Sequence, residues 1–65
     1  MGKTVTAKDA LRILKSLGFE EEKQTGSHLK LRHPDGRWTS VPIHRGDMKK
    51  GTVRAIERQA SVKLT

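Results

Sequence analysis

Cysteine is absent from this 65-residue sequence. No disulfide bond can form, and a zinc site that relies on thiolate ligands is excluded. A chain of this length removes only about 60% of its unfolded surface from water when it folds. Regular secondary structure around one small core must therefore supply the stability, and we expect residues 1–65 to form a single domain.

Long apolar runs are also absent, because no more than two strongly apolar residues follow one another at any point in the chain. This pattern contains neither a transmembrane span nor the apolar core of a secretion signal. Asparagine is missing as well, so the sequence has no acceptor for N-glycosylation. We therefore expect a cytoplasmic protein that does not associate with a membrane.

Acidic residues are scarce relative to basic ones: 7 Asp and Glu stand against 14 Lys and Arg, and the net charge is +7. A surface of this charge attracts polyanions and makes association with nucleic acid fast and salt-dependent. Charge alone does not distinguish RNA from an acidic protein partner, so both stay open at this point. We expect the isolated chain to be monomeric.

The first segment with a clear pattern is an amphipathic helix, predicted over residues 7–17. Thr6 and Asp9 form an N-terminal capping pattern. Apolar residues recur at helical spacing and predict one stripe that faces a core, formed by Ala7, Ala10, Leu11, Leu14 and Leu17. Gly18 then allows the left-handed backbone that ends a helix, and Phe19 can pack back on the last turn.

A β-hairpin follows, with a weak strand over residues 19–24, a loop at 25–27 and a clearer strand over residues 28–32. A three-residue loop predicts these facing pairs: Gln24 with His28, Glu22 with Lys30 and Glu20 with Arg32. The same register places Phe19 beside Leu29 and Leu31, whereas a two-residue turn would place Phe19 among the charges. We interpret the acidic run at residues 20–22 as structural, since cross-strand pairing with Lys30 and Arg32 accounts for two of the three glutamates.

The rest of the chain predicts one more strand and one more helix. A turn at Pro34–Gly36 precedes a strand over residues 37–41, which ends before Pro42, and a short helix is predicted over residues 52–59. The fold class is therefore α+β with the order α-β-β-β-α. We expect a three-stranded antiparallel sheet with two helices on one face and the other face open to solvent.

His28 is the candidate catalytic residue, because strand alternation places it with Lys30 and Arg32 on the open face. A histidine in such a strip can take the proton of a ribose 2′-hydroxyl while the cations stabilise charge on the phosphate. Cleavage of RNA by this route needs no metal ion and no cofactor. The alternative is an exposed histidine that lies beside two solvated cations and has no catalytic role.

The other candidate positions carry less specific signals. His33 precedes Pro34 at a turn and is interpreted as structural, and Trp38 has the strand parity of the open face, where a base could stack on it. Three histidines without cysteine show no metal-binding spacing, so we expect no metal site. Further candidates for RNA contacts follow the third strand: His44, Arg45, Lys49, Lys50 and Arg54.

Five fragments, in order and spacing, resemble the HicA (YcfA-like) toxin family of toxin-antitoxin systems. They are "LKSLGF", "GSH", "RHPDGR", "VPIH" and "KKGTVRAIERQA", and the resemblance covers roughly residues 7–62. It implies a fold like that of double-stranded-RNA-binding domains. It also implies an mRNA interferase, an endoribonuclease that cleaves mRNA and arrests translation until a HicB-type antitoxin covers its active surface. In this family the histidine of the Gly-Ser-His segment is catalytic, which here is His28, preceded by Gly26 and Ser27.

Two other functions remain open beside this one. The same fold and charge could hold RNA without cutting it, as a non-catalytic RNA-binding module. The basic surface could instead serve only to bind an acidic protein. The endoribonuclease would shorten labelled RNA, and the RNA-binding module would retard it intact. The protein-binding surface alone would show no salt-dependent affinity for RNA.

Overall fold

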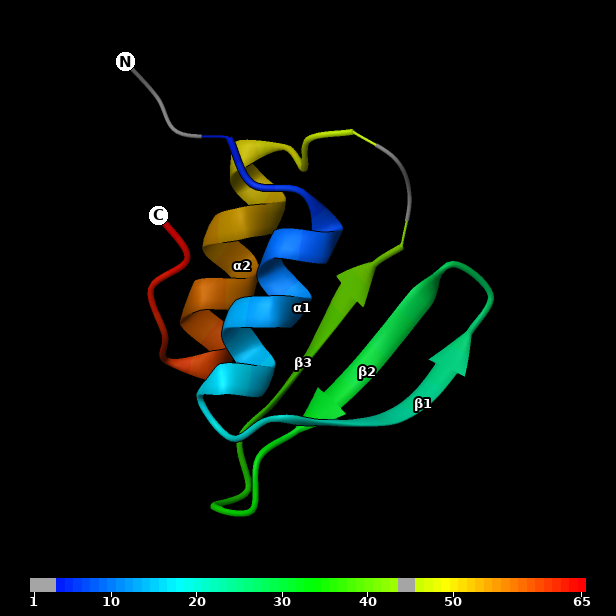
Figure 1. The fold of residues 1–65 in the computed structure, drawn as a ribbon, viewed down its shortest axis with the longest axis vertical. Coiled ribbons are helices and arrows are strands. Elements are labelled where there is room, and N and C mark those ends of the chain that lie inside the picture. The colour runs from blue at the N-terminus through cyan, green and yellow to red at the C-terminus, as the bar shows by residue number, and fades with distance from the viewer. Residues whose placement is uncertain (1–3, 44–45) are drawn as a thin grey trace.

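The computed structural model describes residues 4–43 and 46–65. Two helices and three strands follow one another in the predicted order: α1 (Ala7–Ser16), β1 (Glu20–Thr25), β2 (His28–Arg32), β3 (Trp38–Pro42) and α2 (Lys50–Ala60). The strands form one antiparallel sheet in the order β1-β2-β3. Both helices lie against the same face of this sheet (Figure 1), so the predicted α+β class and architecture are confirmed.

Helix α1 has a hydrogen-bonded cap at each end. The Thr6 hydroxyl accepts from the Asp9 amide at 3.1 Å, and the Asp9 carboxylate accepts from the Thr6 amide at 3.3 Å, which is the predicted capping box. At the other end Gly18 has φ of +101°, and the Phe19 amide donates to the Leu14 carbonyl at 3.0 Å. This is a Schellman closure, and it turns Phe19 into the core.

The prediction that Leu17 belongs to the buried stripe is wrong, since this side chain is 47% exposed. The helix ends at Ser16, one residue earlier than predicted, and Leu17 is its C-terminal cap. The helical period therefore no longer fixes the direction of the Leu17 side chain. Leu11 and Ile13 lie at the margin of the core, where they are partly buried.

The β1–β2 hairpin has a two-residue turn, Gly26–Ser27, and not the predicted three-residue loop. The facing pairs near the turn are consequently different from those predicted: Thr25 with His28, Gln24 with Leu29 and Lys23 with Lys30. A β-bulge between Glu21 and Lys23 then shifts the register by one residue. Beyond the bulge, Glu20 faces Arg32 as predicted.

The bulge reconciles the short turn with burial of Phe19. Without it, a two-residue turn would place Phe19 on the charged side of the hairpin, which is why the longer loop was expected. With one extra residue at Glu22, Phe19 returns to the side of Leu29 and Leu31 and is only 2% exposed. The predicted burial of Phe19 is therefore confirmed, although the predicted loop is wrong.

The remaining boundaries differ from prediction by one or two residues. β3 begins at Trp38 and includes Pro42, and α2 begins at Lys50 and ends at Ala60. Helix α2 starts without a side-chain cap, and Ser61 ends it in the left-handed conformation, with φ of 53° and ψ of 47°. No helix within residues 4–43 and 46–65 is long and apolar enough to cross a membrane.

The core lies between the two helices and the covered face of β2 and β3. Its most deeply buried side chains come from both helices, from β2 and β3, and from the connection between α1 and β1: Leu14, Phe19, Leu31, Val41 and Ile56. Thr39 is the buried polar residue among them, and its hydroxyl donates to the Gln59 side-chain oxygen at 2.9 Å. β1 is exposed along its whole length and forms the edge of the sheet away from both helices (Figure 1).

Candidate active site on the open face of the sheet

Alternation along β2 and β3 separates a buried set of side chains from an open one. Leu29, Leu31, Thr39 and Val41 are buried against the helices. Their neighbours project to the opposite side, which no helix covers. The open face therefore carries the residues in register across β2 and β3: His28 with Pro42, Lys30 with Ser40, and Arg32 with Trp38.

His28 stands at the start of β2, immediately after the turn. Gly26 takes φ of +59° there, a value that favours glycine, and the Ser27 carbonyl accepts from the Ile43 amide at 2.5 Å. This bond joins the turn to the end of β3 beside His28. The side chain of His28 is exposed, and it makes no hydrogen bond or ion pair with any residue of 4–43 or 46–65. No side-chain contact within the described residues therefore occupies its ring nitrogens, and a substrate can reach them.

Trp38 shares the open face with Lys30, as its strand parity predicts. The Lys30 ammonium lies 4.9 Å from the centre of the indole ring, which is within the range of a cation–π contact. The Trp38 side chain nevertheless keeps much of its surface in water, because the residue is 46% exposed. An exposed aromatic ring beside a cation offers a flat apolar surface and a charge at the same place.

Glu22 connects the two cations of β2. One carboxylate oxygen lies 3.3 Å from the Lys30 ammonium, and the other lies 3.1 Å from Nε of Arg32. Glu22 reaches both because the bulge releases it from direct pairing with a single residue of β2. The predicted ion pair between Glu22 and Lys30 is therefore present, although the register behind it differs from the predicted one.

Lys23 is a residue of this face that the sequence reasoning missed. In the predicted register it would face Leu29 and point toward the helices. The bulge instead sets it opposite Lys30, and residues that face each other across a sheet project to the same side. The "TGS" sequence, which also fits a two-residue turn, was the only signal that could have located it.

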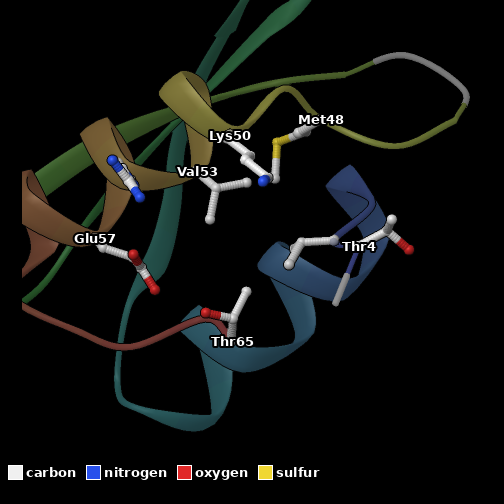
Figure 2. Close-up of a pocket in the computed structure, with 8 residues that line it drawn as sticks. Thr4, Met48, Lys50, Val53, Glu57 and Thr65 are labelled. Atoms are coloured by element: carbon white, nitrogen blue, oxygen red, sulfur yellow. The ribbon is translucent and has the colours of Figure 1, made fainter. Parts of the chain in front are cut away.

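The remaining basic candidates do not converge on His28. Lys49, Lys50 and Arg54 lie at the beginning of α2, in the helical layer on the other side of the sheet. Lys50 and Arg54 line a groove of about 470 Å³ between this helix, the N-terminal segment and Thr65 (Figure 2). His44 and Arg45 lie outside the described residues.

His33 is held in place by backbone groups on both sides of its ring. Nε2 lies 3.1 Å from the Leu17 carbonyl oxygen, and Nδ1 lies 3.1 Å from the Asp35 amide nitrogen. With a proton on Nε2 the ring donates to Leu17 and accepts from the Asp35 amide, and Nδ1 also lies 3.0 Å from an oxygen of the Asp35 carboxylate. The ring also packs edge-on against Phe19, with 5.1 Å between centroids. These contacts support the interpretation of His33 as structural.

Arg37 lies near His33 and connects the turn before β3 to the end of α2. Its guanidinium donates to the Asp35 carboxylate at 2.8 Å and to the Ala60 carbonyl at 2.6 Å, and it lies 5.2 Å from the centre of the Phe19 ring. The Arg37 amide also donates to Asp35 at 3.0 Å. That backbone hydrogen bond, followed by the guanidinium, lowers the pKa of the exposed Asp35 carboxyl below its usual value.

Metal-binding clusters are not found among residues 4–43 and 46–65, where no three His, Asp or Glu side chains are arranged to hold an ion. The open face itself carries one imidazole, several cations and an aromatic ring. This set can transfer a proton and bind a polyanion with stacked bases.

Comparison with known proteins identifies the family to which this arrangement belongs. No individually curated protein matches the chain. The family model described as HicA toxin of bacterial toxin-antitoxin matches residues 7–62, a range that contains all five helices and strands. Because this match spans most of the sequence, the chain belongs to the HicA toxin family of bacterial toxin-antitoxin systems.

Proposed function

We propose that this protein is an mRNA interferase, a metal-independent endoribonuclease in which His28 transfers the proton. The observation that carries the proposal is the position of His28. The imidazole of the Gly26-Ser27-His28 segment lies exposed on the open face, on the same strand as Lys30 and Arg32. Membership in the HicA toxin family supports the same activity. We place its action in the cytoplasm, where bacterial mRNA is translated.

The proposed reaction uses the ribose of the substrate as nucleophile. The neutral imidazole of His28 accepts the proton of a 2′-hydroxyl, whose oxygen then attacks the adjacent phosphorus. Lys30 and Arg32 stabilise the negative charge that gathers on the phosphate oxygens. The bond from phosphorus to the 5′ oxygen breaks, that oxygen takes up a proton from water, and the His28 imidazolium returns its proton to the solvent. The products are a 2′,3′-cyclic phosphate and a 5′-hydroxyl end.

Other residues of the open face would bind the RNA on either side of the bond that is cut. An RNA base can stack on the exposed indole of Trp38. Lys23 adds a cation opposite Lys30, at the edge of the sheet where the RNA would leave the open face. Gly26 and Ser27 act indirectly, because they form the turn that sets the position of His28.

The family also implies an antitoxin partner. We propose a HicB-type antitoxin that lays an acidic surface over His28, Lys30 and Arg32 and thereby excludes RNA. Lys49, Lys50 and Arg54, together with His44 and Arg45, are proposed as further contacts to RNA. Co-expression with the antitoxin frame should give a complex that no longer cleaves RNA, whereas separate elution of the two proteins would contradict the pairing.

The decisive test replaces His28 by alanine. We expect His28→Ala to reduce cleavage of labelled RNA by about 10²- to 10⁴-fold, the usual contribution of a general acid or base. RNA retardation in a gel should persist, since the cations remain. Cleavage by the unmodified protein should be unaffected by EDTA and should leave a cyclic phosphate.

His33→Ala is the control for loss of an imidazole elsewhere, compared at a temperature where circular dichroism shows both variants to be folded. Unchanged cleavage by His28→Ala would refute the catalytic assignment. Retardation of RNA without any cleavage by the unmodified protein would favour the binding-module alternative.

A further inference from the structure

The contact between Glu22 and the two β2 cations has the form of an occupied anion site. Lys30 and Arg32 are separated by one residue on a strand, so both side chains project to the open face. A single carboxylate spans them, with a different oxygen directed at each cation, at 3.3 and 3.1 Å. The spacing of the two cations therefore suits an anion that presents two oxygens on one central atom.

A phosphodiester group is such an anion. It carries one negative charge and two unshared oxygens on phosphorus, so it can replace the Glu22 carboxylate without changing the number of charges at the site. Arginine and lysine are also the usual partners of phosphate oxygens in nucleic-acid complexes. Lys30 lies two residues from His28, a distance of about 7 Å along an extended strand. A phosphate held here would belong to the nucleotides next to the catalytic histidine.

The Glu22 carboxylate is held weakly enough to be displaced. The side chains of Glu22 and Lys30 are each 38% exposed, and that of Arg32 is 56% exposed. Ion pairs with this much exposure are screened by water and salt and contribute little. Glu22 also lies in the bulge of an exposed edge strand, so a rotation of its side chain disturbs no buried group.

We propose that Lys30 and Arg32 form a subsite for one RNA phosphate, and that the Glu22 carboxylate fills this subsite in the free protein. RNA has to displace Glu22 in order to bind. The inference rests on the proposed function, which it deepens: Glu22 competes with substrate inside the same chain. This role differs from the purely structural one expected for the acidic run at residues 20–22.

The test compares two substitutions that change the net charge equally. Glu22→Gln removes the competing charge. Glu20→Gln is the matched control, because Glu20 lies on the same strand, faces Arg32, and makes no ion pair with any residue of the described segments 4–43 and 46–65. The ligand is a short RNA with methylated 2′-hydroxyls, which can bind but cannot be cut. Fluorescence of the single tryptophan, Trp38, reports binding because Lys30 contacts its ring.

We expect Glu22→Gln to tighten binding roughly 3- to 10-fold, and Glu20→Gln to change it by less than about 2-fold. The difference should shrink as salt is raised, since the competition is electrostatic. Equal effects of the two substitutions, or weaker binding by Glu22→Gln, would overturn the inference. Thermal unfolding of both variants verifies that they are folded at the temperature of the titration.

Failure of the proposed function gives a different result. If the unmodified protein binds the methylated RNA but does not cut unmethylated RNA, catalysis is refuted, and the comparison of Glu22→Gln with Glu20→Gln still decides the subsite. If the unmodified protein and both variants bind no RNA at any salt concentration, the subsite and the proposed function are both refuted.

Discussion

Gly18 and Gly36 form a matched pair for measuring what His33 contributes, because both have φ of +101°. They differ in what surrounds them. A Cβ atom at Gly18 would lie 2.9 Å from Nε2 of His33, whereas a Cβ at Gly36 would meet nothing within 4 Å. Substitution by alanine therefore strains the backbone at both positions but displaces a neighbour only at Gly18. The difference between the two variants isolates that displacement.

The expected magnitudes follow from these two effects. A left-handed backbone costs a residue with a Cβ about 1–2 kcal/mol, which is the whole cost expected for Gly36→Ala. Gly18→Ala also pushes the His33 ring away from the Leu17 carbonyl, which it contacts at 3.1 Å. Loss of that hydrogen bond adds about 0.5–1.5 kcal/mol. Gly18→Ala should therefore be the more destabilising substitution by about that amount.

Thermal and urea unfolding measure the difference directly. At about 4–8 °C per kcal/mol for a domain of this size, Gly18→Ala should melt roughly 2–12 °C below Gly36→Ala. In a His33→Ala background the extra cost should disappear, since the displaced ring is gone. Equal melting temperatures of Gly18→Ala and Gly36→Ala in the otherwise unmodified protein would refute the role given to His33.

Two further predictions concern single positions. Ser61 ends α2 with φ of 53°, so Ser61→Gly should raise the free energy of unfolding by about 0.5–1 kcal/mol, measured by urea titration, and a decrease would contradict the assigned backbone strain. The folded state lowers the pKa of Asp35 from its usual 3.8, chiefly through the backbone hydrogen bond from Arg37. The resulting stability is present above pH 3.8 and is lost as the pH falls through the lower folded value. Melting temperature should therefore fall less steeply in Asp35→Asn than in the unmodified protein below pH 3.8, and parallel curves would argue against this linkage.

The sequence predicts those parts of the fold that depend on local patterns, namely helix caps and the alternation of side chains along a strand. The Thr6–Asp9 capping box, the closure at Gly18 and the alternation of Leu29 and Leu31 are local patterns, and each is present in the structure. Because alternation also fixes the side to which His28 projects, its exposure could be predicted. The exposed Trp38 follows from the same rule applied to β3.

The parts that could not be predicted depend on the bulge. A bulge has no strict sequence signature in a run such as "EEEKQ", because any of these polar residues can occupy the extra position on an exposed edge strand. The turn length and the bulge were also coupled: either a long loop or a short turn with a bulge buries Phe19. The sequence does not distinguish the two solutions, and the register predicted from it would direct Lys23 toward the helices instead of the open face. Leu17 was misplaced for another reason, since a helical period says nothing beyond the last helical residue.

The bulged, charged β1 strand also affects how copies of this protein behave together. As the edge of the sheet, it presents backbone donors and acceptors that a second molecule could pair with. The bulge at Glu22 interrupts their even spacing, and in an antiparallel pairing centred on Glu21 the three consecutive glutamates of two copies would repel each other. Extension of the sheet from one molecule to the next is thereby disfavoured. The residues that make β1 a poor strand by propensity thus protect the chain against aggregation through its open edge.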